Sequence, residues 1–291
     1  MQRVCAFLLL TLILSFPITT LSQKKKTPEV TRPPLLVRTT SRHELRRFAF
    51  GGTLTLIGAP EGSITIEGWP RSEIDITAEI ELHADTEADL DMLAKVNTIV
   101  LDADVNHLSV LTTGTHDKAF MRSVAKKFPK TLLGLPWKVD YRVRVPLSID
   151  LEISAGRGAI NLTGVEGNIR LSGTQSETNV KLSGGTLSTT VAVGKVNLTI
   201  PVRSWHGVGA EVRLAAGEIN LEIPNGFNGD IDAVILRSGQ IVDSYGGLEP
   251  RENPGITPQK IKARSGAGGA SFHLTVGDGT IYIKKTVSSE R

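Results

Sequence analysis

Short stretches of alternating apolar and polar residues recur along residues 149–224, and each restarts after a glycine-rich break. Their apolar positions lie two residues apart, as in a β-strand with one buried face. The paired apolar positions are Ile160/Leu162, Ile169/Leu171, Val180/Leu182, Val196/Leu198 and Ile219/Leu221. Because one such strand cannot bury its apolar side alone, we expect the strands to stack around a shared core. This predicts a mainly β fold with a β-solenoid.

Asparagine occupies the same position in three of these stretches. In each, Asn161, Asn197 or Asn220 separates the inward-facing β-branched residue from the inward-facing leucine. If the strands stack in register, the three amides form a polar ladder on the outer face. Asn161-Leu-Thr and Asn197-Leu-Thr also match the N-glycosylation sequence, a match that a threonine-rich strand repeat readily produces by chance.

Residues 48–138 predict an N-terminal β-sheet region that carries two surface helices. Strand patterns occupy residues 53–57, 63–67 and 73–82. A helix is predicted over residues 86–96, with Thr86 as its N-cap. A second helix is predicted near residues 117–128, where Phe120, Val124 and Phe128 fall on one face among basic residues. Either this helix packs its phenylalanines on the sheet, or it docks on a membrane surface or a partner.

Residues 139–291 are predicted to form the β-solenoid repeat region, and its last strands lie at residues 272–276 and 280–284. Two segments interrupt the strand pattern. Residues 114–138 form a charged insert, and residues 237–260 form a long segment rich in glycine and proline. A loop of that length is expected to be either functional or disordered. The sequence leaves the role of both segments open.

Residues 1–22 have the pattern of a secretory signal peptide, because Arg3 precedes an apolar run over residues 4–16 and small or polar residues follow. We therefore expect the protein to be exported and to be periplasmic, cell-surface or secreted. The single cysteine, Cys5, lies within this segment. A mature chain without cysteine has neither a disulfide framework nor a thiolate metal site, and no cofactor is expected.

The chain is basic, with a formal net charge of +3, but the positive charge is concentrated in residues 23–47. Eight basic residues stand there against two acidic ones, so the rest of the chain carries a net negative charge. We expect no nucleic-acid interface on the folded part. Residues 23–47, with Lys24, Lys25 and Lys26, are predicted to be a linker. It is either a solvated spacer or a peripheral contact to anionic envelope polymer or lipid headgroups.

No compact catalytic motif is present, since the sequence lacks G-x-S-x-G, H-E-x-x-H, a P-loop and C-x-x-C. We therefore expect no enzyme activity. One catalytic alternative is a polysaccharide lyase or hydrolase that groups Asp230, Asp232 and Asp243 with Arg237. Separately, Trp205 and His206 lie between two repeats. There an exposed indole would stack on a sugar or a partner surface, or else pack over the end of a strand layer.

Several local motifs together resemble the bacterial putative-adhesin domain-of-unknown-function family. They are Gly62-Ser-Ile-Thr-Ile-Glu-Gly-Trp, the helix at residues 86–96, Val143-Arg-Val-Pro, the Gly-x-Ile-Asn-Leu units and Gly277-Asp-Gly-Thr-Ile-Tyr-Ile. The resemblance covers roughly residues 48–285. It implies an extracytoplasmic, β-helix-like domain with no established catalytic residues. The segments 114–138 and 237–260 are longer than the family pattern requires.

These observations predict a non-catalytic, adhesin-like or scaffolding protein of the bacterial cell envelope. Its outward polar rows would bind a glycan, an envelope polymer or a protein partner through many weak contacts. Trp205, His206, the three asparagines and the basic residues 24–26 are the predicted contacts. Besides the polysaccharide lyase or hydrolase, the remaining alternative is a self-associating structural envelope protein. The oligomeric state is left open.

Overall fold

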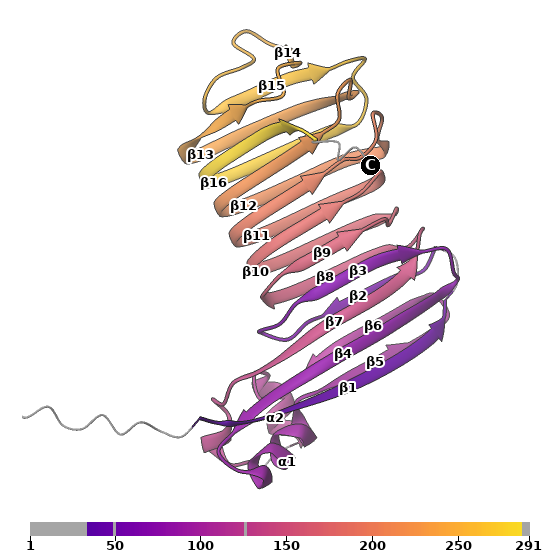
Figure 1. The fold of residues 1–291 in the computed structure, drawn as a ribbon, viewed down its shortest axis with the longest axis vertical. Coiled ribbons are helices and arrows are strands. Elements are labelled where there is room, and N and C mark those ends of the chain that lie inside the picture. Colours follow the sequence, from indigo (N-terminus) through magenta and orange to yellow (C-terminus); the bar gives the residue numbers. More distant parts are fainter. Residues whose placement is uncertain (1–33, 49–50, 125–126, 287–291) are drawn as a thin grey trace, which may run out of the picture. The chain divides into compact units, whose positions relative to one another are not determined.

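The computed structural model describes residues 34–48, 51–124 and 127–286, so the predicted signal peptide and Lys24, Lys25 and Lys26 lie outside the described residues. Residues from Leu35 onward form one compact unit. The fold is mainly β, as predicted: the described residues contain sixteen strands, two α-helices and one short 3-10 helix (Figure 1).

The N-terminal part of the chain contains both α-helices as well as strands. Their bounds are β1 (Leu36–Arg47), β2 (Thr53–Ile57), β3 (Ile64–Trp69), β4 (Glu73–Ala84), α1 (Glu87–Val96), β5 (Thr98–Ala103), β6 (His107–Thr113), α2 (Lys118–Val124), η1 (Lys130–Leu132) and β7 (Trp137–Pro146). The C-terminal elements are all strands. Their bounds are β8 (Asp150–Arg157), β9 (Ile160–Thr163), β10 (Asn168–Lys181), β11 (Gly184–Thr199), β12 (His206–Ile223), β13 (Gly229–Asp243), β14 (Glu249–Pro250), β15 (Lys260–Ser265) and β16 (Ser271–Lys285).

All strands belong to one open sheet, in which β10, β11, β12, β16 and β13 lie side by side in parallel (Figure 1). The first half of β10 pairs with β8 and its second half pairs with β9. In turn, β8 pairs with β2 and β9 pairs with β3, both in parallel. The parallel pairing therefore continues across the boundary that the sequence predicts between residues 138 and 139.

The predicted inward-facing pairs are confirmed. All ten of their side chains are buried, and Leu162, Leu198 and Leu221 have no exposed surface. All of them except Ile160 belong to one hydrophobic core that also contains residues of the N-terminal strands, among them Leu54, which is fully buried. Shared burial of apolar side chains from successive strands is therefore the main stabilising contribution, as the alternating pattern predicts.

Some glycines at the predicted breaks lie inside long strands, since β11 runs through Gly194 and β12 runs through Gly217, whereas Gly158 lies between β8 and β9. Strand β10 contains both Ile169 and Val180 and so joins two of the short stretches predicted from the sequence. At Gly194 and Gly217 the φ angles are +140° and +135°, a conformation that residues with a Cβ rarely adopt. The strand changes direction there, and both of its halves contribute side chains to the same core.

The prediction that residues 23–47 are a linker is wrong for residues 36–47, which form strand β1. All twelve residues of β1 pair antiparallel with β4. Its side chains are mostly exposed, so β1 lacks the apolar alternation that identifies strands from sequence. Polar contacts hold it instead: Arg38 bonds Glu87 and Asp91 of α1 at 2.5 and 2.7 Å, and Arg42 bonds the Ile99 carbonyl at 2.7 Å.

The first predicted helix is confirmed and the second is shorter than predicted. Thr86 caps α1, with its hydroxyl accepting the Asp89 N–H at 3.1 Å. Helix α2 is described over Lys118–Val124, and within it Met121 is buried while Phe120 is half-buried. Among the described residues, neither helix has the length and apolar character needed to span a membrane.

Residues 237–260 are not one long loop, contrary to the prediction. Strand β13 continues to Asp243, and β14 pairs with β15. Strand β15 runs antiparallel along the first half of β13. The N–H groups of Ile235 and Ile241 donate to the carbonyls of Gln259 and Pro258 at 2.9 and 2.6 Å. This segment therefore covers the outer edge of β13, the last strand of the parallel series.

Candidate functional site

A groove lined by small residues runs across the outer side of the parallel strands. It consists of three adjoining hollows of about 520, 460 and 570 Å³. The first two share Ser154, Ser172 and Thr190, and the first and third share Thr174. Because Ser154, Ser172 and Thr190 are register partners on β8, β10 and β11, the groove crosses the strands rather than following one of them.

The groove arises because small side chains recur just before the bend in each strand. These residues are Ser154, Ala155 and Gly156 on β8, Ser172, Gly173 and Thr174 on β10, Thr190 and Ala192 on β11, Ala215 on β12, and Thr275 and Gly277 on β16. Neighbouring strands lie ≈ 4.7–4.9 Å apart, so the hydroxyls repeat at that spacing. The sequence does carry a signal for this groove, because Ser154, Ser172 and Thr190 recur at a spacing of eighteen residues.

Charged side chains border the groove, and each arginine there is paired with a carboxylate. Arg170 bonds Glu152 at 2.8 Å, and Arg213 bonds Glu211. Arg237 bonds Asp278 at 2.5 and 2.8 Å, and the hydrogen bond from Arg237 lowers the pKa of the Asp278 carboxyl. Exposed apolar surface comes from Ile57, Val193 and Leu236. The lining therefore combines hydroxyls and aliphatic carbon with charges that cancel locally.

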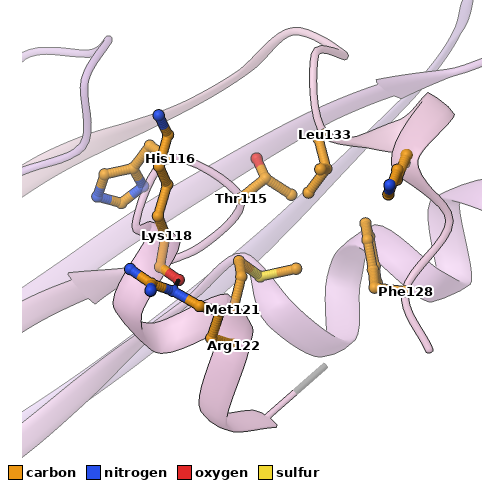
Figure 2. A pocket seen from close by; sticks show the side chains of 8 residues that line it. Thr115, His116, Lys118, Met121, Arg122, Phe128 and Leu133 are labelled. Atoms are coloured by element: carbon orange, nitrogen blue, oxygen red, sulfur yellow. Dashed lines mark hydrogen bonds between the residues drawn. The ribbon is translucent and has the colours of Figure 1, made fainter. Parts of the chain in front are cut away.

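A second hollow lies beside α2 and the η1 turn (Figure 2). Its volume is about 770 Å³, and its lining is mostly apolar. Met121, Phe128 and Leu133 contribute the apolar surface, while Lys118 and Arg122 lie at its border. It belongs to the insert at residues 114–138 for which the sequence predicted no role.

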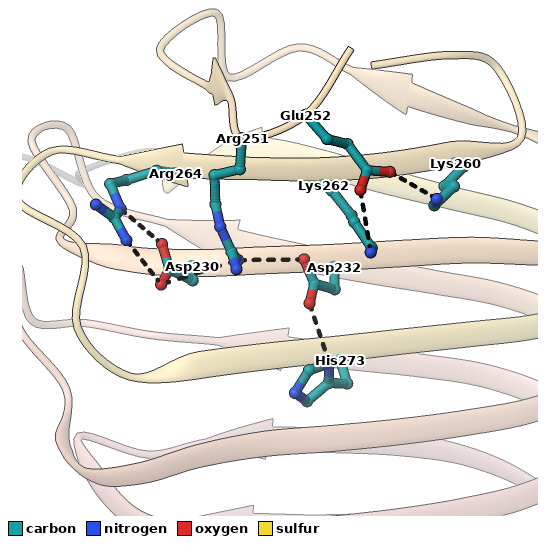
Figure 3. Close-up of polar contacts among 8 residues, drawn as sticks. All are labelled: Asp230, Asp232, Arg251, Glu252, Lys260, Lys262, Arg264 and His273. Atoms are coloured by element: carbon teal, nitrogen blue, oxygen red, sulfur yellow. Dashed lines mark hydrogen bonds and ion pairs between the residues drawn. The ribbon is translucent and has the colours of Figure 1, made fainter. Parts of the chain in front are cut away.

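Two carboxylates of the predicted catalytic alternative, Asp230 and Asp232, lie in an ion-pair network at β13 and β15 (Figure 3). Asp230 and Asp232 do share one face of β13, as predicted, but arginines occupy them. Arg264 bonds Asp230 at 2.9 and 3.3 Å, and Arg251 bonds Asp232 at 3.3 Å. The hydrogen bond from Arg264 lowers the pKa of the Asp230 carboxyl, whereas a general acid at neutral pH needs a raised pKa.

The other members of that predicted catalytic group lie elsewhere. Arg237 pairs with Asp278 instead of facing the two aspartates. Asp243 accepts the N–H groups of Tyr245 and Gly246 at 2.8 and 3.4 Å, which makes it a turn residue. Within the described part of the chain, no three His, Cys, Asp or Glu side chains are grouped to hold a metal ion. The predicted grouping of Asp230, Asp232 and Asp243 with Arg237 is therefore wrong.

The predicted asparagine ladder is confirmed and includes a fourth amide. Asn179 donates to Asn161 at 3.0 Å, Asn197 to Asn179 at 2.6 Å and Asn220 to Asn197 at 2.9 Å. Lys284 donates to Asn220 at 3.2 Å and continues the row. Because the amides bond one another, they hold the strands in register. Their role in binding an external ligand stays a prediction.

The prediction of an exposed indole at Trp205 is wrong. The side chain is only 7% exposed, and its Nε1–H donates to the Gly185 carbonyl at 2.9 Å. Its ring packs edge-to-face against the Phe272 ring with the two ring centroids 5.5 Å apart, a favourable aromatic arrangement. Packing thus explains this residue, as the second interpretation of the sequence expected. His206 next to it is exposed, and its binding role stays a prediction.

Comparisons with known proteins give structural similarity at low sequence identity. No family model matches the chain, and no curated protein matches it. A putative cell adhesion protein from Clostridium sporogenes ATCC 15579 is 14% identical with a TM-score of 0.46, and the match covers 85% of this chain and all of that one. A putative adhesin from Bacteroides fragilis NCTC 9343 is 12% identical with a TM-score of 0.26, over 86% and 97% of the two chains.

A third similar structure is a putative lipid binding protein from Parabacteroides distasonis ATCC 8503. It is 10% identical with a TM-score of 0.25, and the match covers 84% of this chain and 96% of that one. Two of the three proteins are thus described as adhesion proteins. At these TM-scores and identities, none of them assigns a function to this chain.

Proposed function

We propose that this protein is a non-catalytic, adhesin-like binding protein of the bacterial cell envelope, and that its ligand is an elongated glycan chain. The observation that carries the proposal is the groove across β8, β10, β11, β12 and β16. Hydroxyls line it on β8, β10, β11 and β16, and its bordering arginines are already paired. A polymer of hydroxyl-bearing units matches such a lining better than a strongly charged ligand does.

Repetition is the physical basis of the proposed affinity. Each hydroxyl of the lining offers one weak polar contact, for example that of Thr174 or Thr190, both exposed. Once one unit of a linked ligand has bound, its neighbours are held at high effective concentration, so many weak contacts add to a useful affinity. A short ligand occupying one or two strands gains little from this effect.

The parallel strands, in this proposal, form a short β-solenoid of the kind seen in the putative-adhesin family that the sequence resembles. In-register parallel pairing supports this, because Asn161, Asn179, Asn197 and Asn220 follow one another across four strands. The proposal includes export directed by residues 1–22. It also includes a peripheral contact of the basic residues 24–26 with anionic envelope components.

The proposal predicts that affinity rises steeply with ligand length. The probes are neutral chito-oligosaccharides of two and six sugars, and the measurement is isothermal titration calorimetry on the purified protein. We expect the hexasaccharide to bind at least about tenfold more tightly than the disaccharide, since linked contacts add. No new reducing ends should appear during the incubation, because the proposed role is non-catalytic.

A matched pair of substitutions tests the site. Thr190→Arg fills the groove where its first two hollows meet, whereas Thr163→Arg places the same side chain on an exposed position of β9 outside the groove. We expect Thr190→Arg to weaken hexasaccharide binding at least about tenfold and Thr163→Arg to leave it unchanged. Equal affinity for both oligosaccharides, or equal effects of the two substitutions, would contradict the proposal.

A further inference from the structure

The hollow beside α2 has an apolar floor, in which Met121 is largely buried, Phe128 is half-buried and Leu133 is exposed. Met121, Phe128 and Leu133 line it together with Thr115, and its volume is about 770 Å³ (Figure 2). Ligand sites for small molecules typically measure ≈ 300–1,000 Å³ and are lined mainly by apolar side chains. In size and in lining, this hollow therefore has the character of a small-molecule site.

Three cations lie around this apolar floor. Lys118, Arg122 and Lys130 all line the hollow, and all three are exposed. Arg122 donates through Nε to the Lys118 carbonyl at 3.1 Å. Within the part of the chain that the structure describes, none of the three forms an ion pair. This contrasts with Arg170 and Arg237 of the groove, which are paired with carboxylates.

One carboxylate nearby, Asp117, attracts Arg122 and offsets one of the three positive charges, so the border keeps a net positive charge. The Asp117 carboxylate accepts the N–H groups of Ala119 and Phe120 at 2.8 and 3.0 Å. His116 lies against Trp137, with ring centroids 5.4 Å apart. Burial lowers the pKa of the His116 imidazole, so it is neutral at neutral pH. The border of the hollow is therefore positively charged while its floor is apolar.

We propose that this hollow binds a single-chain anionic amphiphile, a fatty acid, with its carboxylate at Arg122, Lys118 and Lys130 and its alkyl chain on Met121, Phe128 and Leu133. Charge complementarity selects the anionic headgroup, since a guanidinium matches a carboxylate in a two-point contact. The apolar floor selects the alkyl chain, because burial of that chain removes hydrocarbon from water. This site is separate from the groove and does not depend on the proposed glycan binding.

The test compares amphiphiles that share one chain and differ in headgroup charge. Dodecanoate and dodecyltrimethylammonium are titrated into the purified protein below their critical micelle concentrations and dodecanol below its solubility limit, with butanoate as the short-chain control. Calorimetry should show dodecanoate binding with a stoichiometry of one. Dodecyltrimethylammonium should bind at least about tenfold more weakly, because each charge-assisted bond contributes about a factor of ten. Butanoate should not bind measurably.

Two substitutions separate the roles of charge and apolar surface. Arg122→Gln should weaken dodecanoate binding about tenfold and leave dodecanol binding unchanged, because only the charged contact is lost. Leu133→Asp should weaken both. Leu133 is already 42% exposed, so this change should leave the fold intact. Val105→Asp is the matched control, since Val105 is 84% exposed and lies outside the hollow.

Three results would overturn the proposal. The first is equal binding of the anionic and cationic amphiphiles, which would remove the role of the three cations. The second is dodecanoate binding that survives Leu133→Asp. The third is a lack of dodecanoate binding together with either a dimer in light scattering or attachment to anionic vesicles. In that case a second copy of the chain or a bilayer surface, rather than a single fatty acid, covers the apolar floor.

Discussion

Tyr141 shows how a single polar group is accommodated in this core. The side chain is fully buried on β7, and its hydroxyl lies 2.6 Å from the Thr112 hydroxyl. Thr112 in turn donates to the Ile57 carbonyl at 2.8 Å, so Tyr141 is the donor in the first bond. The two bonds link β7, β6 and β2. Burial disfavours the phenolate and raises the pKa of Tyr141 to about 12.

This raised pKa predicts a loss of stability in alkaline solution. The unfolded chain releases the Tyr141 proton near its ordinary pKa of about 10, whereas the folded chain retains it to about 12. The contribution to stability is therefore fully present below pH 10 and is lost as the pH rises toward 12. The loss should amount to about 2 to 3 kcal/mol, since each pKa unit corresponds to about 1.4 kcal/mol.

Tyr141→Phe provides the reference, measured by urea unfolding between pH 8 and 12. It should cost about 1 kcal/mol at pH 8, because one hydrogen bond is lost while Thr112 keeps its bond to Ile57. Above pH 10 the variant should lose less stability than the parent protein. Parallel pH profiles for the two proteins would show that Tyr141 does not titrate as its burial implies.

At the scale of the strand, a column of glycines sets the bend. An added Cβ at Gly194, Gly217 or Gly279 would lie 1.8 to 2.0 Å from a carbonyl oxygen of the neighbouring strand. Gly279 also has a positive φ, of +145°. The bend in each strand thus packs directly on the backbone of the neighbouring strand. These positions require glycine because the φ angle is positive and because the neighbouring backbone leaves no room for a Cβ.

Gly217→Ala is expected to destabilise the protein by about 2 to 4 kcal/mol, because the methyl group meets the Gly194 carbonyl and the φ of +135° is strained. Gly134→Ala is the control. An added Cβ there meets nothing within 4 Å, so its effect should stay within about 0.5 kcal/mol. Urea unfolding monitored by circular dichroism measures both, and a loss of similar size at the two glycines would contradict this account of the bend.

The sequence could predict the inward-facing strand residues, because alternation directly reports burial. Leu162, Leu198 and Leu221 followed that rule. It could not predict the bends, since a glycine with positive φ inside a strand looks the same as a glycine in a turn. Strand β1 was missed because backbone pairing and ion pairs hold it, and neither leaves a periodic pattern. The groove was missed because it depends on small residues aligned between strands.

The strand face on which a charged residue lies could be predicted from the sequence, but its ion-pair partner could not. Asp230 and Asp232 were correctly placed on one strand face, yet no local pattern pairs them with Arg264 and Arg251. Arg264 lies on β15 and Arg251 follows β14, so both reach the aspartates only because β15 pairs with β13 and β14 pairs with β15. Trp205 was misjudged for a related reason, since Phe272 lies next to it only through the pairing of β12 with β16. In both cases the contact depends on the pairing of strands that are far apart in the sequence.

At the scale of the whole described unit, antiparallel strands end the parallel series. Strand β4 pairs with β1 and β6 pairs with β5 at one end, while β13 pairs with β15 at the other. The exposed side chains of β1 include Arg42, Arg46 and Arg47. Charged edge strands disfavour pairing between molecules. We therefore expect the protein to be monomeric, which contrasts with the self-associating alternative considered from the sequence.

Removal of the edge strand should change this behaviour. A chain that begins at Phe48 lacks β1 and leaves all twelve residues of β4 without their antiparallel partner. Because unpaired strand edges are templates for pairing, this variant should associate through β4 as its concentration rises. A chain that begins at Leu35 keeps β1 and should remain monomeric. Light scattering over a range of concentrations separates the two, and association of the Leu35 chain would show that β1 does not protect this end of the sheet.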